Sequence, residues 1–544
     1  MTVTNEQPTL HYDAALDDLD PRVHARRWFT LGTLCISLLI IVMDNTILNV
    51  AIPKLIDELG ATNSQVQWIV DGYTLVFAGL LLTAGSLGDR FGRKLALRTG
   101  IFIFAIGSIL SALSGTPNQL IAARCLMGVG GALIMPSTLS ILTNVFRDPR
   151  ERGRAIAVWA GFSGLGVAIG PVIGGILLAH FSWGSVFWVN VPIAVIAITL
   201  GIFFVPESKD PSAPRLDPIG AGLSIVGLGA LLFAIIEGPS NGWGSGMVLG
   251  AFAIGIVGLV SFILWELHTD HPMLDMSFFK NPRFTAANLA ITLTFLAMFG
   301  SMFLMTQYWQ FVHGYTPLEA GVRLIPFAMT MMITAPLSAR IVEKVGTKYV
   351  VSGGLAIVTL ALVLLSFIEP HTSYPVVLGF MCLMAMGMGL TMAPATESVM
   401  GSLPREKAGV GSAVNDTTRQ MGGALGVAII GTIVASVYSS GVSSIASSFG
   451  LTPEQTDVAK SSLGGALAKV APQLGDRAHD FVESVNTEFV NGLSSGLRLG
   501  AIIVFVAAVV AFKFLPAFAT DPLAHPEQQD AQGELTGVVP AAGS

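Results

Sequence analysis

Long apolar runs, separated by short polar segments, make up most of this chain. A helix that crosses the hydrocarbon core of a bilayer needs roughly 20 mostly apolar residues, and the runs are about that long. The pattern therefore predicts fourteen membrane-spanning helices. They are expected at residues 28–52, 66–86, 95–114, 119–143, 154–180, 184–205, 218–236, 246–267, 285–312, 321–341, 349–368, 374–396, 409–437 and 494–516.

Composition supports this interpretation. The 544 residues are 52% hydrophobic and 12% charged, whereas ordinary soluble proteins contain about 25% charged residues. We therefore predict an all-α polytopic membrane protein in contact with lipids. We expect a monomer without a nucleic-acid partner, metal or cofactor.

The basic residues predict an orientation, because loops rich in Lys and Arg usually stay in the cytoplasm. One set of alternate loops is basic, whereas the other short loops contribute little beyond Lys54 and Arg323. This places both termini in the cytoplasm of a cell whose inner (plasma) membrane holds the protein. The basic set comprises Arg26, Arg27, Arg90, Arg93, Lys94, Arg98, Arg147, Arg150, Arg152, Arg154, Lys209, Arg215, Lys280, Arg283, Arg340, Lys344, Lys348, Arg405, Lys407 and Lys513.

The spacing of the runs predicts two bundles of six spans with two additional spans between them. The polar ends predict tails, of which the C-terminal one has a disordered composition. The predicted regions are a cytoplasmic tail at 1–27, the N-terminal bundle at 28–206, a linker and two additional spans at 207–283, the C-terminal bundle at 284–516 with an extracellular loop of two short helices at 438–493, and a cytoplasmic tail at 517–544.

An internal repeat supports this division. The segment "GSLGDRFGRKLALRTGI" aligns with "ARIVEKVGTKYVVSGGL", so that Gly92 matches Gly346 and Asp89 matches Glu343. Both segments connect the second and third spans of a predicted bundle. Two halves related by an axis along the membrane normal are a known transporter plan.

Several motifs carry a family resemblance. "GSLGDRFGRK" (85–94) resembles the loop signature of the major facilitator superfamily, and "MDNTILNVAIP" (43–53) resembles the first-helix motif of its fourteen-span drug:proton antiporters. "GVAIGPVIGG" (166–175) resembles the antiporter motif of the fifth helix, and "RCLMGVGGA" (124–132) the fourth-helix motif, with Met127 where the family often has Gln. Together with "QWIVDGYTLVFAG", "PESK" and "FSWGSVFWVNVP", they make the chain similar to the QacA-type multidrug exporters over nearly its whole length.

The resemblance implies a cytoplasmic gate at the first motif. Its glycines permit a tight turn, and Asp89 can accept hydrogen bonds from an arginine or from the N-terminus of a neighbouring helix. The alternative is that the loop is basic for topology alone. The predicted gate residues are Gly85, Asp89, Arg90, Gly92, Arg93 and Lys94.

The fifth-helix motif places glycines at a spacing of four residues, which aligns them on one helix face for close packing. We expect either a seal between the halves, with a bend at the proline, or ordinary helix packing. The motif residues are Gly166, Gly170, Pro171, Gly174 and Gly175.

Asp44 interrupts an apolar run, where an ionised carboxylate costs about 2.5–3.5 kcal/mol on insertion scales. Burial favours the protonated carboxyl, so Asp44 could exchange a proton for a cation when water reaches it. The alternative is a structural Asp bonded to a neighbouring helix. Arg124 lies a few residues into the fourth span. The resemblance implicates it in proton coupling, and the alternative is that it reaches outward to the membrane surface.

Asp416 is the second predicted carrier of protons or cations, because the resemblance links an acid at this position to proton coupling. Arg419 lies three residues later on the same helix face, so a static ion pair is the alternative. We also predict Asp71, at the outer mouth, and Tyr308 and Trp309 in an aromatic and Met-rich span as substrate-binding residues. Core or lipid-facing packing is the alternative for these aromatic side chains, and a solvated span end is the alternative for Asp71 and the expectation for Glu397.

The combined prediction is a proton-coupled antiporter that exports hydrophobic, cationic drugs or dyes by alternating access. An exporter of one endogenous metabolite, antibiotic or lipid would use the same architecture. The sequence contains no HExxH, no CxxC and no P-loop, which disfavours a metalloprotease or an ATP-driven pump. We therefore predict a transporter rather than an enzyme or a receptor.

Overall fold

The computed structural model describes residues 21–59, 61, 63–210 and 216–517. The predicted tails at 1–27 and 517–544 lie almost entirely outside these residues, apart from the first turns of α1 and residue 517. Fourteen of the described helices are long and apolar enough to cross a membrane, which confirms the predicted number. The α-helices are α1 (Pro21–Leu59), α2 (Asn63–Phe91), α3 (Arg93–Ala112), α4 (Pro117–Val145), α5 (Pro149–His180), α6 (Ser185–Trp188), α7 (Asn190–Phe204), α8 (Pro218–Asn241), α9 (Gly246–His268), α10 (Pro282–Gln307), α11 (Pro317–Arg323), α12 (Ile325–Val345), α13 (Thr347–Leu365), α14 (Tyr374–Met400), α15 (Ala408–Phe449), α16 (Pro453–Ser461), α17 (Leu463–Gly465) and α18 (Ala478–Phe514).

Six shorter helical turns connect or extend these helices. The turns η2 and η4 are π-helical, and the other four are 3₁₀. They are η1 (Met276–Lys280), η2 (Tyr308–Val312), η3 (Arg405–Lys407), η4 (Ala466–Val470), η5 (Ala471–Gln473) and η6 (Gly475–Arg477).

Local sequence explains where many of these helices begin. A polar residue followed by proline starts several of them, because the polar side chain accepts a backbone hydrogen bond and proline needs no acceptor at the first helical position. Asp148 caps α5 in this way, Asp217 caps α8 and Asn281 caps α10. The ends of the spans are therefore encoded locally, although the apolar runs between them decide that they cross the membrane.

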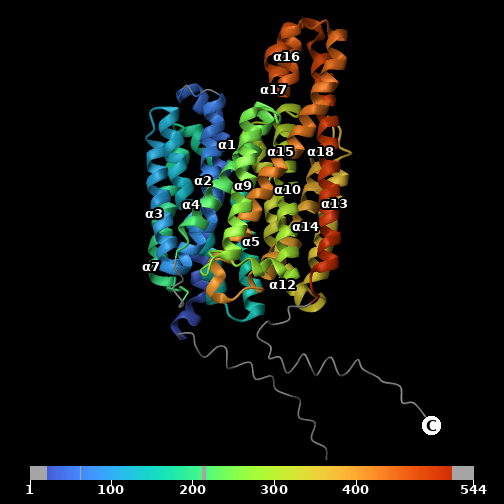
Figure 1. Ribbon diagram of the computed structural model, residues 1–544. Coiled ribbons are helices and arrows are strands. Elements are labelled where there is room, and N and C mark those ends of the chain that lie inside the picture. Colours follow the sequence, from blue (N-terminus) through green and yellow to red (C-terminus); the bar gives the residue numbers. More distant parts are fainter. Residues whose placement is uncertain (1–20, 60, 62, 211–215, 518–544) are drawn as a thin grey trace, which may run out of the picture.

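The helices form two bundles and a separate hairpin (Figure 1). Helices α1–α7 pack around one apolar core, whereas α10–α18 enclose most of a second, larger core. The hairpin of α8 and α9 supplies the two additional spans, and α8 packs against both α2 and α15. It therefore lies across the seam between the two bundles.

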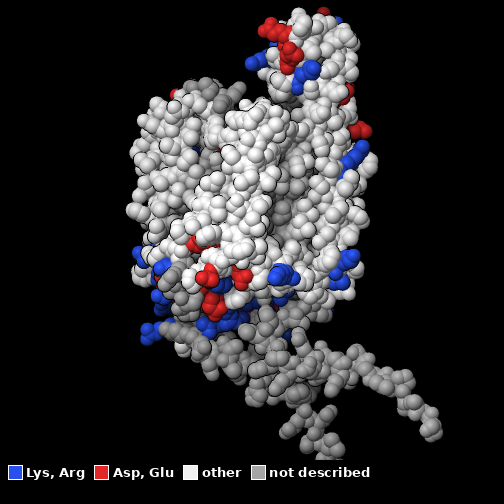
Figure 2. Space-filling view, in the orientation of Figure 1, with Lys and Arg blue, Asp and Glu red and all other residues white. Residues whose placement is uncertain are grey.

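The two ends of the bundle differ in charge. Lys and Arg gather at the end where α1 begins and α18 ends, which we call the basic end, and a broad band of the visible face above it carries almost no charge (Figure 2). The opposite end carries α16 and α17, and we call it the cap end (Figure 1). The uncharged band fits the hydrocarbon core of a membrane.

The predicted extracellular loop is shorter than expected. Helix α15 continues to Phe449 and α18 already begins at Ala478, so much of 438–493 extends two spanning helices beyond the membrane. The first short helix exists as α16, with a capping box between Thr452 and Gln455. The second predicted helix is the start of α18, because the weakly periodic sequence after Ala478 runs unbroken into the last apolar span.

The internal repeat is visible in the backbone. Gly92 precedes α3 with φ of 117°, and Gly346 precedes α13 with φ of 96°. L-residues rarely adopt such angles, so the glycines aligned by sequence make the same type of tight connection. The two bundles therefore share the same type of glycine turn as well as the same overall arrangement.

Candidate functional site

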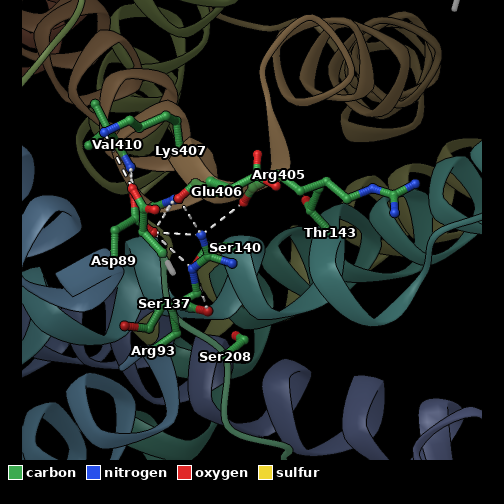
Figure 3. A network of polar contacts seen from close by, with 12 residues as sticks. Asp89, Arg93, Ser137, Ser140, Thr143, Ser208, Arg405, Glu406, Lys407 and Val410 are labelled. Carbon is green, nitrogen blue, oxygen red and sulfur yellow. Dashed lines mark hydrogen bonds and ion pairs between the residues drawn. The ribbon is translucent and has the colours of Figure 1, made fainter. Parts of the chain in front are cut away.

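Asp89 joins the two bundles at the basic end (Figure 3). Its Oδ1 accepts a hydrogen bond from the backbone N–H of Gly409 at 2.9 Å, and its Oδ2 accepts from Val410 at 3.0 Å. These N–H groups lie in the first turn of α15, which has no side-chain cap of its own. Asp89 therefore caps a helix of the opposite bundle, where the helix dipole favours a negative charge.

Arg93 completes this contact. Its side chain pairs with Asp89 at 2.7 Å, and its Nη2 donates to the backbone carbonyls of Arg405 and Glu406 at 2.9 Å each. Both Asp89 and Arg93 are at most 2% exposed. The ion pair therefore lies in a dry interface, and each partner also bonds to the backbone of the other bundle.

Small residues let α2 and α15 approach each other here. A Cβ at Gly85 would lie 2.6 Å from the carbonyl oxygen of Gly409, and a Cβ at Gly409 would collide with the Asp89 carboxylate. A larger residue at either position would push the helices apart and lengthen the Asp89 hydrogen bonds. Gly85 thus acts through packing.

The segment that follows α7 also belongs to this network. The backbone N–H of Arg93 donates to the carbonyl of Ser208 at 2.9 Å, and the N–H of Asp210 donates to the carbonyl of Asp89 at 2.7 Å. The buried Asp210 carboxylate pairs with Lys407 of the opposite bundle at 3.4 Å. Ser208 of the "PESK" segment and the adjacent Asp210 therefore bind the loop between α2 and α3 through backbone hydrogen bonds.

Three predicted gate residues support this arrangement from outside the inter-bundle contact. The backbone N–H of Lys94 donates to Glu207 at 3.1 Å, and a Cβ at Gly92 would lie 2.7 Å from the same carboxylate. The guanidinium of Arg90 lies 5.5 Å from the ring of Phe91. These residues shape the loop, whereas Asp89 and Arg93 make the contacts between bundles.

Two further ion pairs cross the interface at the basic end, and the sequence analysis missed both. Arg152 of α5 pairs with Glu397 of α14 at 2.7 Å, and Arg154 pairs with Glu343 at 2.9 Å. Glu343 aligns with Asp89 in the repeat, and this alignment could have indicated that Glu343 also forms a contact between the bundles. The pair with Arg152 shows that Glu397 is not simply a solvated end of its span.

Asp44 and Arg124 form a buried ion pair inside the N-terminal bundle. One carboxylate oxygen accepts from Nη1 of Arg124, and the other accepts from the side-chain amide of Asn190 at 2.9 Å. The Nε of Arg124 donates to the carbonyl of Ile69 at 3.1 Å, and its guanidinium lies 4.3 Å from the ring of Tyr73. Arg124 therefore does not reach outward, and in this conformation Asp44 is bonded to neighbouring helices.

Asn190 extends the network and was also missed. Its amide lies 3.1 Å from the hydroxyl of Ser108, which in turn donates to the carbonyl of Phe187 at 2.8 Å. Asn190 is a polar residue in an otherwise apolar span, "FWVNVP". A buried amide needs hydrogen-bond partners, so this position could have indicated a polar contact within the membrane.

The fifth-helix glycines explain how α1 comes close to α5 around Asp44. A Cβ at Gly166 would lie 2.9 Å from Val42, and one at Gly174 would lie 2.8 Å from Ile47, while Gly170 faces Thr46. This part of the motif packs within one bundle. Pro171 and Gly175 instead face α11 of the opposite bundle, where Gly175 would contact Leu318. The motif therefore packs both within its own bundle and against the opposite one, and its role as a seal stays a prediction.

Asp416 and Arg419 lie on α15 and are buried without pairing. Asp416 accepts from Asn415 at 3.3 Å through Oδ1, while Oδ2 has no hydrogen bond. Nη2 of Arg419 donates to Thr396 at 2.9 Å, and its Nε has no acceptor. Among the described residues, the salt bridges do not include an Asp416–Arg419 pair. The static ion pair, which was the alternative to a role in proton coupling, is therefore absent from this conformation.

The remaining predicted substrate residues are separate from these clusters. Asp71 lies where α2 meets α8, beside Trp68, Phe233 and Glu237. Tyr308 and Trp309 are at most 1% exposed in the core of the C-terminal bundle, and Tyr308 donates to the carbonyl of Glu369. Their substrate role stays a prediction, and this packing gives it no support.

In the described part of the chain, His, Cys, Asp and Glu form no group of three that could hold a metal ion. The chemistry that the site can perform is proton exchange at carboxyls and attraction of positive charge. Both depend on the buried acids in the spanning helices.

Comparison with known proteins places this arrangement in a family. Residues 34–427 match the model of the Major Facilitator Superfamily. The multidrug efflux pump LfrA of Mycolicibacterium smegmatis is 35% identical over 489 residues, which cover 90% of this chain and 96% of that protein. The tetracenomycin C resistance and export protein of Streptomyces glaucescens is 30% identical, covering 90% of this chain and 92% of the relative.

A third relative is similar in sequence, and two solved structures have the same fold. The methyl viologen resistance protein SmvA of Salmonella typhimurium is 34% identical over 81% of this chain and 89% of its own length. The human organic anion transporter MFSD10 is 15% identical, covers 88% of this chain and 99% of its own, and superposes with a TM-score of 0.57. The proton:xylose symporter XylE gives the same TM-score at 14% identity, over 90% of this chain and 96% of its own. This chain is therefore a membrane transporter of the Major Facilitator Superfamily, related to its multidrug efflux pumps.

Proposed function

We propose that the protein is a proton-coupled antiporter that exports lipophilic, cationic drugs or dyes. The observation that carries the proposal is Asp416, a carboxyl buried in a spanning helix with one oxygen that lacks a hydrogen bond. An ionised carboxylate in that place is costly, whereas a protonated one is not. Asp416 can therefore hold a proton while the site is dry and release it when water enters.

Asp44 has a different part in this proposal. Its two oxygens are already bonded to Arg124 and Asn190, so it acts on protons or cargo after these bonds loosen. Thr46, two residues after Asp44 on α1, contacts α5. Movement of α1 against α5 would therefore also disturb the bonds of Asp44. Arg124 keeps its charge throughout, because guanidinium groups do not lose their proton in proteins.

The proposed orientation places the basic end in the cytoplasm of a cell whose inner membrane holds the protein. This follows the distribution of Lys and Arg, which gather at that end (Figure 2). Asp89 and Arg93 then form a cytoplasmic gate that is closed in this conformation. Opening requires that Asp89 leave the first turn of α15, as expected if two bundles rock around a central site.

The preference for cations rests on chemistry and on relatives. Buried acids attract positive charge, and aromatic rings add about 0.5–2 kcal/mol. SmvA is named for resistance to methyl viologen, which is a bipyridinium dication. The second candidate, export of one antibiotic or metabolite, is favoured by the relative that exports tetracenomycin C.

The test is drug transport in inverted membrane vesicles with an imposed pH gradient. We expect ethidium to accumulate in the vesicles, a protonophore to abolish this, and Asp416→Asn to remove the gradient-driven part. Asp457→Asn, in α16 at the cap end, is the matched control and should transport normally. Gradient-driven uptake that survives in Asp416→Asn would contradict the proposed coupling, and a panel of neutral compounds would reveal the second candidate.

The gate is tested separately by chemical accessibility. Ser412 is buried on α15, close to the Asp89 contact. In a variant with Ser412→Cys and the three native cysteines replaced, Asp89→Asn should speed up labelling by a membrane-permeable maleimide. Equal labelling rates with and without Asp89→Asn would show that this contact does not keep the basic end closed.

A further inference from the structure

A buried arginine lies between aromatic rings of the two bundles. The guanidinium carbon of Arg419 lies 5.1 Å from the ring of Trp159 and 5.3 Å from the ring of Phe295. Trp159 belongs to α5 of the N-terminal bundle and is fully buried, while Phe295 belongs to α10 of the C-terminal bundle. Two ring faces from opposite bundles therefore form a place for one positive charge at the interface.

This arginine is poorly satisfied for a buried cation. It donates one hydrogen bond to Thr396, its Nε has no acceptor, and Asp416 one turn earlier does not pair with it. Arg124 of the other bundle is equally buried but has a carboxylate, a carbonyl and a ring. Buried charges normally require such partners, so Arg419 occupies its position in this conformation without being fixed there.

We infer that the rings of Trp159 and Phe295 form a binding site for aromatic or alkyl-substituted organic cations, that Arg419 occupies this site when cargo is absent, and that cargo displaces Arg419 onto Asp416. The inference rests on the proposed export of cations and names the site that receives them. The rings suit such cargo, because they attract a cation without demanding a particular hydrogen-bond geometry.

The exchange is balanced in charge. Before cargo enters, the site holds one charged guanidinium and one neutral carboxyl. Arg419 then moves to Asp416, three residues earlier on the same helix face, and the ion pair forms when the carboxyl releases its proton to water in the opened site. A monovalent cargo on the rings restores the original net charge of +1, so one cation enters for each proton that leaves.

Other charged groups near α15 are already engaged. Asp89 contacts its first turn and Arg93 contacts the segment just before it, and Asp416 lies six positions after Val410, which is roughly 9 Å along a helix. From α5 and α14, Arg152 and Glu397 pair with each other, and from α4 Arg124 pairs with Asp44. On α10, Arg283 lies near Gly401 at the basic end. Arg419 is thus the charged neighbour that acts on Asp416.

The experiment measures binding of tetraphenylphosphonium to the detergent-solubilised full-length protein by calorimetry. Removing the competing charge in Arg419→Gln should lower Kd about tenfold, the size expected of a cation–π competition in a desolvated site. Trp159→Leu should raise Kd by a similar factor, whereas Trp159→Phe should restore most of the affinity. Arg477→Gln is the matched control, because Arg477 lies 5.1 Å from the ring of Phe449 on the exposed cap.

A second variant guards against misfolding of Arg419→Gln. Thr396→Val removes the hydrogen bond that holds Arg419 at the rings, and it should lower Kd by a smaller factor. Proton release on binding should also appear as acidification of weakly buffered wild-type protein. Unchanged affinity in Trp159→Leu and Thr396→Val would overturn the inference, even if vesicles of the wild type still show proton-driven efflux. A wild type without proton-driven efflux would instead refute the proposed function.

Discussion

Each bundle buries an aspartate and an arginine in its spanning helices, but the two couples are arranged differently. Asp44 and Arg124 pair directly, and Asn190 and Ile69 satisfy further atoms. Asp416 and Arg419 are neighbours on one helix, yet each keeps an atom without a partner. The first couple is fully bonded in this conformation, whereas in the second couple one atom of each partner lacks a hydrogen bond. Under the proposed function, this difference makes Asp416 the readily exchanged proton site, while Asp44 takes part only after its bonds to Arg124 and Asn190 loosen.

The strongest test of this contrast is removal of each acid. Asp44→Asn leaves the Arg124 charge buried without its counter-charge, and such changes cost about 3–5 kcal/mol. Asp416→Asn removes a carboxyl that has no paired cation, so its effect on unfolding should be small. Thermal unfolding in detergent compares the two variants, and equal losses of stability would show that both couples are structural.

The aligned acids of the repeat give the next contrast. Asp89 is buried and accepts two backbone N–H groups besides Arg93, so Asp89→Asn should cost about 2–3 kcal/mol. Glu343 forms a partly exposed pair with Arg154, so Glu343→Gln should cost less than about 1 kcal/mol. Chemical denaturation of both variants at the same ionic strength measures this difference. A larger loss in Glu343→Gln would reverse our assignment of the principal closing contact.

The repeat also offers two glycines with positive φ. Gly92→Ala should cost about 2–3 kcal/mol, because strain at such angles is joined by crowding against the Glu207 carboxylate. Gly346→Ala should cost about 1–2 kcal/mol from the strain at its positive φ. Gly353→Ala, in the middle of α13 with open space around it, is the control and should not destabilise. If Gly92→Ala and Gly346→Ala lose the same stability, Glu207 does not restrain the loop.

The smallest contrast concerns histidines at the cap end. Burial lowers the pKa of His313, with smaller contributions from His371 and Arg323, so the folded protein binds this proton less readily than the unfolded chain. Stability should therefore fall as the pH drops below about 6.5, the ordinary pKa of histidine. His313→Gln should flatten this dependence of the melting temperature on pH. An unchanged slope in His313→Gln would exclude this group as its source.

The spans and the repeat could be predicted because they depend on local sequence. Apolar runs of sufficient length leave few alternatives to spanning helices, and the aligned glycines identified the two tight connections. The ends of α15 and α18 could not be predicted in the same way. Their extensions beyond the membrane are rich in Ser and charged residues, so packing of one helix on the other replaces the apolar signal.

The site could be predicted in its residues but not in its pairing. Asp44 stood out because charge is rare in apolar runs, and the family motifs indicated Asp89, Arg124 and Asp416. Their partners depend on which helices meet in space, and α4 brings Arg124 to an aspartate 80 positions earlier in the chain. The burial of Tyr308 and Trp309 in the C-terminal core could not be predicted, because composition does not reveal which side of a helix faces a core.

The hairpin of α8 and α9 has a consequence for how lipophilic molecules enter. Helix α8 touches both α2 and α15, and Trp243 on its loop donates to Thr432 of α15 at 3.2 Å. The hairpin therefore covers one side of the interface between the bundles, and it blocks entry of a lipophilic molecule from the bilayer at that side. If α2 and α15 part in the proposed transport cycle and α8 stays with one of them, that helix decides which bundle carries the hairpin.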